Sequence, residues 1–498
     1  MTQSSFMWRP KSQLGAMVSG RRVPTSDGKH PTVAMGILLF AFLSSPEIAG
    51  RVPPVPTAGR APSATEETAG LIQRGFNLLA QKDTAGAEAA FRRVIDIQPE
   101  SPAAHRGLGL ALWSERQVEA AWRELQVATR LDPADAEAHF ALGKIAWTLS
   151  AQPDLAKPVG PAMSAMEFRR VALAELNKAT GLRPLDFEMQ LSLATYNIEA
   201  ERAREAVAVA QQALRAATTV PQQALAHATL GRASLVLGEI DRAEAEFNAA
   251  LQLDPAGGEA HFGLGEVRLS QGKPLQAERE LRLAIWAAPD WAPPYSVLAG
   301  VLIDQGQAGE ARPLLEKAIS LNPGDWQGQY RLATLLNEAG DTKQAVELFG
   351  EVARRQPDFL PVREQLGRSL LRRGDIQGAT AQADALMAKE PGAAEGHRLM
   401  ALALWKQRNY DGALAAAAMA LNAEPESAAM LALQAIALWQ LDRKKESRGV
   451  LVQAAKLQSN VTTAEVFCRL LLCDARDITL VGDFLRKNRW VIQPSSAP

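Results

Sequence analysis

A period of 34 residues runs through most of this 498-residue chain and constrains its fold more than any other feature. Prolines mark the spacing, and two longer steps, to Pro184 and Pro221, add 17 and 3 residues to it. The other prolines of the series are Pro99, Pro133, Pro255, Pro289, Pro323, Pro357, Pro391 and Pro425. A fixed period of this length is the signature of a repeat architecture. Residues 68–461 therefore divide into eleven repeats, with the proline at position 32 wherever it occurs.

Small residues occupy two fixed positions of the repeat. Position 8 is glycine or alanine in all eleven copies, and position 20 is alanine in every copy except the last, which has Ser447. Positions 4, 7, 8 and 11 share one face of a first helix, and positions 20, 24 and 27 share one face of a second. Small side chains let the two helix backbones approach closely, while leucine or phenylalanine at positions 7 and 24 fills the space around them. The pattern predicts an all-α fold of helix-turn-helix pairs that share one continuous core.

This pattern resembles the tetratricopeptide repeat (TPR) family over about four fifths of the chain. Repeat 5, which contains AHATLGRASLVLGEIDRAEAEFNAALQLDP, matches the family at nearly every diagnostic position, whereas repeat 4 fits weakly and repeat 11 lacks the proline. The resemblance implies an α-solenoid, a right-handed superhelix whose concave wall is lined by the first helices. Residues 462–498 are then expected to form capping helices and a tail. The insertion in repeat 3, around 148–165, is expected to be a tolerated surface loop or an added binding surface.

The first fifty residues have the composition of a targeting segment. Arg21, Arg22 and Lys29 precede an apolar run over residues 33–43, which is followed by small residues near Ala49. This order is typical of an export signal, and the run is shorter than the roughly 20 apolar residues that span a bilayer. We therefore expect an exported protein, periplasmic or extracellular, with a proline-rich linker at 51–67. An uncleaved membrane anchor formed by residues 33–43 is the alternative.

Charge and motif content argue against several classes of protein. The chain has 54 Lys and Arg against 55 Asp and Glu, a net charge of -1, which excludes a broadly basic nucleic-acid binder. No metalloprotease motif, P-loop or nucleophile elbow occurs, and Gly107 and Gly263 start incomplete glycine motifs that occupy packing positions of the repeat. We expect no catalytic residues, no metal and no cofactor. Cys468 and Cys473, five residues apart in a predicted regular helix, are expected to stay an inert pair.

Five of the six histidines stand at position 4 of their repeats, where the TPR family commonly places tryptophan. These residues are His105, His139, His227, His261 and His397. Histidines one repeat apart are too far from each other to share an ion, because zinc ligands lie about 2.0 to 2.1 Å from the metal. We therefore expect a packing role for them.

Candidate binding residues come from the positions that, by the resemblance, look into the concave surface. Position 12 is a large apolar residue in ten of the eleven repeats, and position 5 adds further aromatic rings. The predicted protein-binding residues are Trp113, Phe140, Trp147, Phe262, Tyr330, Trp405 and Trp439. Tryptophan is enriched at binding hot spots, and an apolar stripe suits an amphipathic or extended peptide. The alternative for position 12 is packing between successive first helices.

Charged residues at the same concave positions are of mixed sign. They are Arg106, Lys144, Arg232, Glu266, Glu364, Arg368 and Arg398. Position 9 is never asparagine, so the carboxylate clamp known in some TPR domains is not expected. The sequence as a whole predicts a non-catalytic scaffold that binds a protein or peptide partner, without nucleic acid and with possible membrane association through the N-terminal segment. The alternative is an accessory subunit of a cell-envelope assembly, secretion or polysaccharide synthesis and export system.

Overall fold

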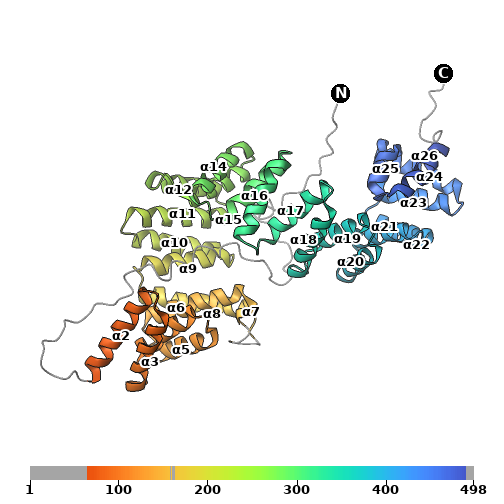
Figure 1. Cartoon of the computed structure of the whole chain (residues 1–498). Helices are drawn as coiled ribbons and strands as arrows, with labels where there is room; N and C mark the ends of the chain where they lie inside the picture. Colours follow the sequence, from red (N-terminus) through yellow and green to blue (C-terminus); the bar gives the residue numbers. More distant parts are fainter. Residues whose placement is uncertain (1–63, 157–158, 160–162, 489–498) are drawn as a thin grey trace. The chain divides into compact units, whose positions relative to one another are not determined.

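The computed structural model describes residues 64–156, 159 and 163–488, and all regular structure in this part of the chain is helical (Figure 1). The predicted all-α class is confirmed, with no strand among the described residues. The predicted signal or anchor at 1–50, and residues 51–63 of the predicted linker, lie outside the described residues. Contacts group the chain into two compact units, residues 1–301 and 302–498.

The first unit is a succession of helix pairs. A first helix packs against the second helix of its own repeat, as α4 packs against α5. A second helix contacts the first helix of the next repeat, as α5 contacts α6. The helices are α2 (Ala64–Ala80), α3 (Thr84–Ile97), α4 (Pro102–Ser114), α5 (Val118–Leu131), α6 (Ala136–Ala151), α7 (Pro153–Ala156), α8 (Ala165–Leu182), α9 (Phe187–Glu199), α10 (Ala203–Ala216), α11 (Val220–Val236), α12 (Ile240–Leu253), α13 (Gly258–Ser270) and α14 (Pro274–Ala287). Helix α15 (Ala292–Asp304) follows, and the second unit begins within it.

The second unit repeats the same pairing and ends in two further helices. Its repeat helices are α16 (Ala308–Leu321), α17 (Trp326–Glu338), α18 (Thr342–Arg355), α19 (Leu360–Arg372), α20 (Ile376–Lys389), α21 (Ala394–Lys406), α22 (Tyr410–Ala423), α23 (Ala428–Gln440) and α24 (Lys444–Leu457). A short 3-10 helix, η3 (Ser459–Thr462), then leads to α25 (Ala464–Leu471) and α26 (Ala475–Lys487). Helices α25 and α26 fall where the sequence predicts a cap, and both contact α23.

The turn between the two helices of a repeat uses a left-handed residue at position 15. Five repeats place glycine there, with φ between 70° and 89°, and five place another residue, with φ between 60° and 64°. Glycine adopts this conformation without steric cost, whereas the conformation is slightly strained for the other residues. Asp or Asn at position 16 often follows and caps the second helix, as Asp83 does by accepting a hydrogen bond from the Gly86 N–H.

Phenylalanine at position 24 joins one repeat to the next. Phe247 is fully buried, and a Cβ atom added to Gly263, at position 6 of the next repeat, would lie 2.1 Å from its ring. Phe91 fills the equivalent space beside Gly107, where an added Cβ would lie 2.2 Å away. The structure thus confirms that these glycines have a packing role.

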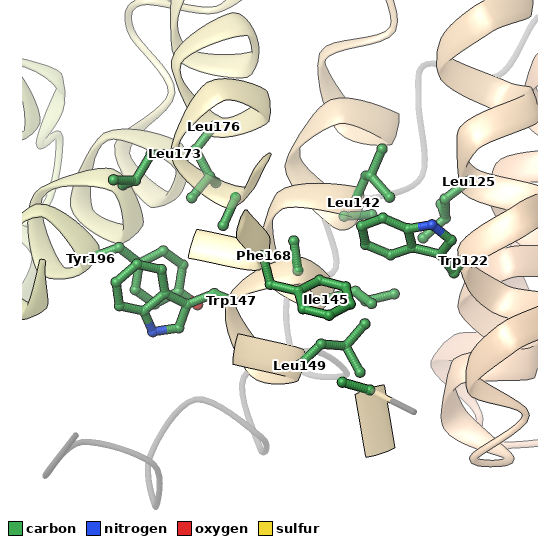
Figure 2. Packing of buried hydrophobic residues seen from close by; sticks show 14 of the residues in the cluster. Trp122, Leu125, Leu142, Ile145, Trp147, Leu149, Phe168, Leu173, Leu176 and Tyr196 are labelled. Atoms are coloured by element: carbon green, nitrogen blue, oxygen red, sulfur yellow. The ribbon is translucent and has the colours of Figure 1, made fainter. Parts of the chain in front are cut away.

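The insertion in repeat 3 is anchored to the core of the first unit. Helix α6 continues to Ala151, the short α7 follows, and α8 starts at a capping box formed by Ser164 and Glu167. Residues Leu155, Val159 and Met163 of the insertion pack against the cluster that contains Trp122, Ile145, Leu149, Phe168 and Tyr196, most of which Figure 2 shows. The described part of the insertion therefore contributes apolar contacts rather than only closing a loop.

Candidate binding surface of the first helices

Within each unit, neighbouring first helices lie side by side. Helix α11 contacts both α9 and α13, and α19 in turn contacts both α17 and α21. Side chains at positions 2, 5, 9, 12 and 13 of neighbouring first helices therefore form one surface, which we call the first-helix face. All seven predicted binding residues belong to it.

Trp147 is the most extensively contacted of these residues in the first unit. Its ring stacks on Tyr196 of the next first helix (Figure 2). The ring centroids are 4.6 Å apart and the planes meet at 11°. Its Nε1 donates a hydrogen bond to Glu199 Oε2 at 2.9 Å, and the guanidinium of Arg169 lies 5.7 Å from its ring. Only 6 % of Trp147 is exposed, so its ring packs between helices, which is the alternative reading of position 12.

Phe140 lies one helical turn from an unusual lysine. Lys144 is buried among the helices, 3.4 Å from Glu188 and 4.9 Å from the centroid of the Phe140 ring. Burial lowers the pKa of Lys144, and the Glu188 carboxylate opposes this shift. Phe140 itself is half-buried, so part of its ring remains open to a ligand.

Two carboxylates with raised pKa follow along the first-helix face. Burial raises the pKa of Glu199 and of Glu266 to about 7 each, and Arg232 acts on both in the opposite direction. Glu266 forms no hydrogen bond or ion pair through its side chain among the described residues. This part of the face is therefore suited to a basic or hydrogen-bond-donating group, because such a group would stabilise the ionised carboxylates.

Half-buried aromatic rings complete this surface in both units. In the first unit, Phe262 meets Trp291 edge-on, with ring centroids 4.9 Å apart, and Trp113 packs partly buried against two core clusters. In the second unit, Tyr330 meets the rings of Phe349 and Phe359 at 5.7 and 5.2 Å. Phe262 and Tyr330 keep part of their surface open to solvent.

Arginines gather on the first-helix face of the second unit. Arg398 is held by carboxylates, including Glu364 at 3.3 Å. Arg368 is half-buried and has no hydrogen bond or ion pair with a described residue. Burial lowers the pKa of Arg368, Glu364 opposes this, and the neighbouring Arg372 and Arg398 add to the lowering. This part of the face is suited to an anionic group.

The two predicted binding tryptophans of the second unit, Trp405 and Trp439, have partners within the chain. Trp405 is fully buried, and the residues beside it, Lys406 and Arg408, bind the buried Asp477 of α26 at 2.6 and 2.8 Å. Trp439 meets Phe484 of the same helix edge-on at 5.7 Å. These two positions are therefore occupied within the chain, while the binding role of all seven predicted residues stays a prediction.

Among the described residues, four of the five position-4 histidines contact the preceding repeat: His105, His139, His261 and His397. Nδ1 of His105 lies 2.6 Å from a Glu124 oxygen of its own repeat, and Nε2 lies 2.8 Å from the Pro99 carbonyl of the preceding one. Tyr295 donates a hydrogen bond to the Pro289 carbonyl at the same repeat position. The same contact to a preceding proline carbonyl is made by His139, Gln190, His261, Gln329 and His397. These residues thus bridge successive repeats, in agreement with their predicted packing role.

No group of three or more His, Cys, Asp or Glu side chains among the described residues could hold a metal ion. Likewise, none of the described helices is long and apolar enough to cross a membrane.

Sequence reasoning missed the residues that surround Trp147. Glu199 occupies position 13, which the family resemblance places on the concave wall. The charged concave residues named from the sequence stand only at positions 5 and 9. Arg169 comes from the second helix of repeat 3, beyond the insertion, so the sequence pattern gives no sign of its contact with Trp147. The charge at position 13 was the available signal for Glu199.

Solved structures similar to this chain include TPR proteins, at low sequence identity. A tetratricopeptide repeat protein from Parabacteroides merdae is 16% identical, with 54% of this chain and 99% of that chain covered and a TM-score of 0.43. YrrB, described as a TPR protein with an unusual peptide-binding site, is 20% identical over 44% of this chain and 98% of its own, with a TM-score of 0.34. The APC/C hetero-tetramer Cut9-Hcn1 matches 75% of this chain and 84% of its own at 14% identity and a TM-score of 0.42. A comparison with curated proteins finds no match.

Two family models match parts of the amino-acid sequence and identify the family of the chain. One model described as tetratricopeptide repeat matches residues 78–145, 302–366 and 336–403. A second model with the same description matches residues 228–290 and 398–460. Together they cover more than half of the chain, and the matched segments fall within the helix pairs described above. The chain therefore belongs to the tetratricopeptide repeat family.

Proposed function

We propose that this protein is a non-catalytic scaffold that binds a protein or peptide partner in a concave groove formed by its first-helix face. The observation that carries the proposal is the combination of half-buried aromatic rings with recessed charges on this face. Phe140 and Phe262 in the first unit and Tyr330 in the second offer partly open rings, and Glu266 and Arg368 offer charges without a partner among the described residues. Aromatic anchors beside desolvated polar groups are typical of protein-binding hot spots.

The charges suggest which ligand groups each part of the face prefers. The first unit presents Glu199 and Glu266, which favour lysine, arginine or hydroxyl groups of a partner. The second unit presents Arg368 and Arg372, which favour Asp, Glu or phosphate groups. The net charge of -1 provides no single strong field, so recognition on each unit depends on these local charges.

The test starts by isolating the partner by affinity purification with the full chain and mass spectrometry. Binding is then measured for Phe262→Ala and Arg368→Gln, with Trp286→Ala as a matched control, because Trp286 lies on second helix α14 and is 74 % exposed. We expect each face variant to weaken binding about tenfold or more, a loss of about 1.4 kcal/mol, and the control to bind as the unchanged protein does. Equal binding by all four proteins would contradict a groove site.

We also propose that the protein acts outside the cytoplasm, on the basis of the basic residues and apolar run within residues 21–43. A more specific possibility, which rests on that location, is an accessory subunit of a cell-envelope assembly, secretion or polysaccharide synthesis and export system. Co-purification with a membrane complex from native cells supports this role, and recovery only with soluble partners contradicts it.

A further inference from the structure

The two cysteines of the chain meet at the turn between α25 and α26. Helix α25 ends at Leu471, and Leu472 adopts the left-handed conformation with φ 54° and ψ 45°. The N–H of Cys473 then donates a hydrogen bond to the Cys468 carbonyl at 3.0 Å. Cys468 and Cys473 are the first and sixth residues of this segment, and a hydrogen bond from the sixth to the first defines a Schellman motif. The side chains of these two residues contact each other in such a motif.

The contact in this motif is usually between two apolar side chains, but here both are thiols. The Cys468 and Cys473 side chains lie close enough to act on each other, and both are half-buried, so small reagents can reach them. In a regular helix, two residues five positions apart in the sequence do not contact each other. The prediction of an inert pair assumed such a helix. The helix instead stops two residues before Cys473, and the left-handed turn folds Cys473 back against Cys468, as their backbone hydrogen bond shows.

We propose that Cys468 and Cys473 form an intramolecular disulfide that closes the left-handed turn between α25 and α26. The oxidant is a low-molecular-weight disulfide such as oxidised glutathione. The Cys468 thiolate attacks one sulfur of this disulfide and releases one glutathione thiolate. The Cys473 thiolate then attacks the Cys468 sulfur of the mixed disulfide and releases the second. The two cysteines lose two protons and two electrons, and one oxidised glutathione becomes two reduced glutathiones.

The crosslink has a consequence for the first-helix face. The turn it closes sets the direction of α26, whose Asp477 binds Lys406 and Arg408 and whose Phe484 packs on Trp439. Burial raises the pKa of both thiols, and that of Cys473 more strongly, so oxidation is slow at neutral pH and accelerates as the pH rises.

Trypsin gives a direct test, because Arg469 lies between the two cysteines. The full chain is reduced, freed of reductant, incubated with oxidised and reduced glutathione, alkylated with iodoacetamide and digested without reduction. We expect peptides 457–469 and 470–476 to appear joined, two hydrogens lighter than their sum, with both free thiols lost together. Two separate glutathione adducts, or a covalent dimer on a non-reducing gel, would overturn the proposal.

A pair of variants tests whether the left-handed turn positions the thiols. Leu472→Gly permits the observed φ, whereas Leu472→Val places a β-branched residue where it is strained. We expect the equilibrium constant for disulfide formation to be about tenfold or more lower in the valine variant than in the glycine variant. Equal constants would show that the turn does not hold the sulfurs together. In Cys473→Ser we expect only a mixed disulfide with glutathione at Cys468, or a covalent dimer.

Discussion

At the scale of single residues, the contacts between repeats depend on glycines, which leave room for a phenylalanine ring. Phe247 reaches into space left by the missing side chains of Gly231 in its own repeat and Gly263 in the next, where added Cβ atoms would lie 2.8 and 2.1 Å from its ring. The helical positions of these glycines cost backbone entropy. That cost is offset by burial of a whole phenylalanine ring between two repeats.

Substituting Gly263 tests this packing. We expect Gly263→Ala to lower the free energy of unfolding by about 1–3 kcal/mol, because the new methyl group overlaps the Phe247 ring. Gly449→Ala is the matched control, since this exposed glycine of α24 has open space around it, and alanine there should raise stability by about 0.5–1 kcal/mol. Urea denaturation of both variants measures the difference, and destabilisation of equal size in both would contradict the argument.

Glu266 provides a second prediction at the residue scale. Its pKa in the folded state, about 7, is raised above the ordinary value of 4.5. Its contribution to stability is therefore fully present below about pH 4.5 and is lost as the pH rises through about 7. We expect Glu266→Gln to be more stable relative to the unchanged protein at pH 8 than at pH 5. The difference between the two proteins is the quantity to measure, with Glu205→Gln, at an exposed glutamate, as the control.

At the scale of elements, the last helix is attached more specifically than a generic cap requires. The carboxylate of Asp477 is fully buried and binds both Lys406 and Arg408, which belong to repeat 10 rather than to the adjacent repeat 11. Asn488, just after α26, also accepts a hydrogen bond from Arg448 of α24 at 3.3 Å. Helix α26 thus covers part of the first-helix face as well as the end of the array.

Removing the Asp477 carboxylate should release this helix. We expect Asp477→Ala to cost about 3–5 kcal/mol locally, because it leaves the nearly buried Lys406 without its closest anion. Hydrogen exchange of residues 475–487 should become faster, while exchange in α19 stays unchanged. Asp483→Ala removes an exposed ion pair with Arg486 on the same helix and should cost less than about 1 kcal/mol. Similar exchange in the two variants would show that Asp477 does not anchor α26.

At the scale of the whole molecule, the net charge of -1 is the sum of local charges that differ between the two units. The first unit carries carboxylates of raised pKa on its first-helix face, and the second carries arginines of lowered pKa. Recognition by such a surface depends on short-range contacts, because salt screens exposed charges beyond a Debye length of about 8 Å at physiological ionic strength.

The N-terminal segment gives the prediction that concerns the mature protein. If residues 33–43 form a cleaved export signal, N-terminal sequencing of the protein from native cells should give a first residue close to Arg51. The protein should then appear in the periplasmic or extracellular fraction. An intact segment in protein recovered with membranes would favour the anchor instead.

The sequence by itself determined the helix pairs, their period and the packing positions, because these depend on local spacing that recurs in every repeat. Position 8 and position 20 are small wherever two backbones approach, and the proline at position 32 follows the end of a second helix. The five histidines at position 4 were likewise predictable as packing residues from their register alone.

Only the tertiary structure decided which residues of the first-helix face remain open. Trp147 and Trp405 have the same register as Trp113, yet Trp147 is covered by Tyr196 and Trp405 is fully buried. Trp147 contacts Arg169 of α8, which follows the insertion, and the residues beside Trp405 bind Asp477 of α26, which lies outside the repeat pattern. The backbone hydrogen bond from Cys473 to Cys468 also depends on one left-handed residue, Leu472, which follows the end of α25. The physical reason is that burial and side-chain contacts depend on long-range neighbours, which a local period does not specify.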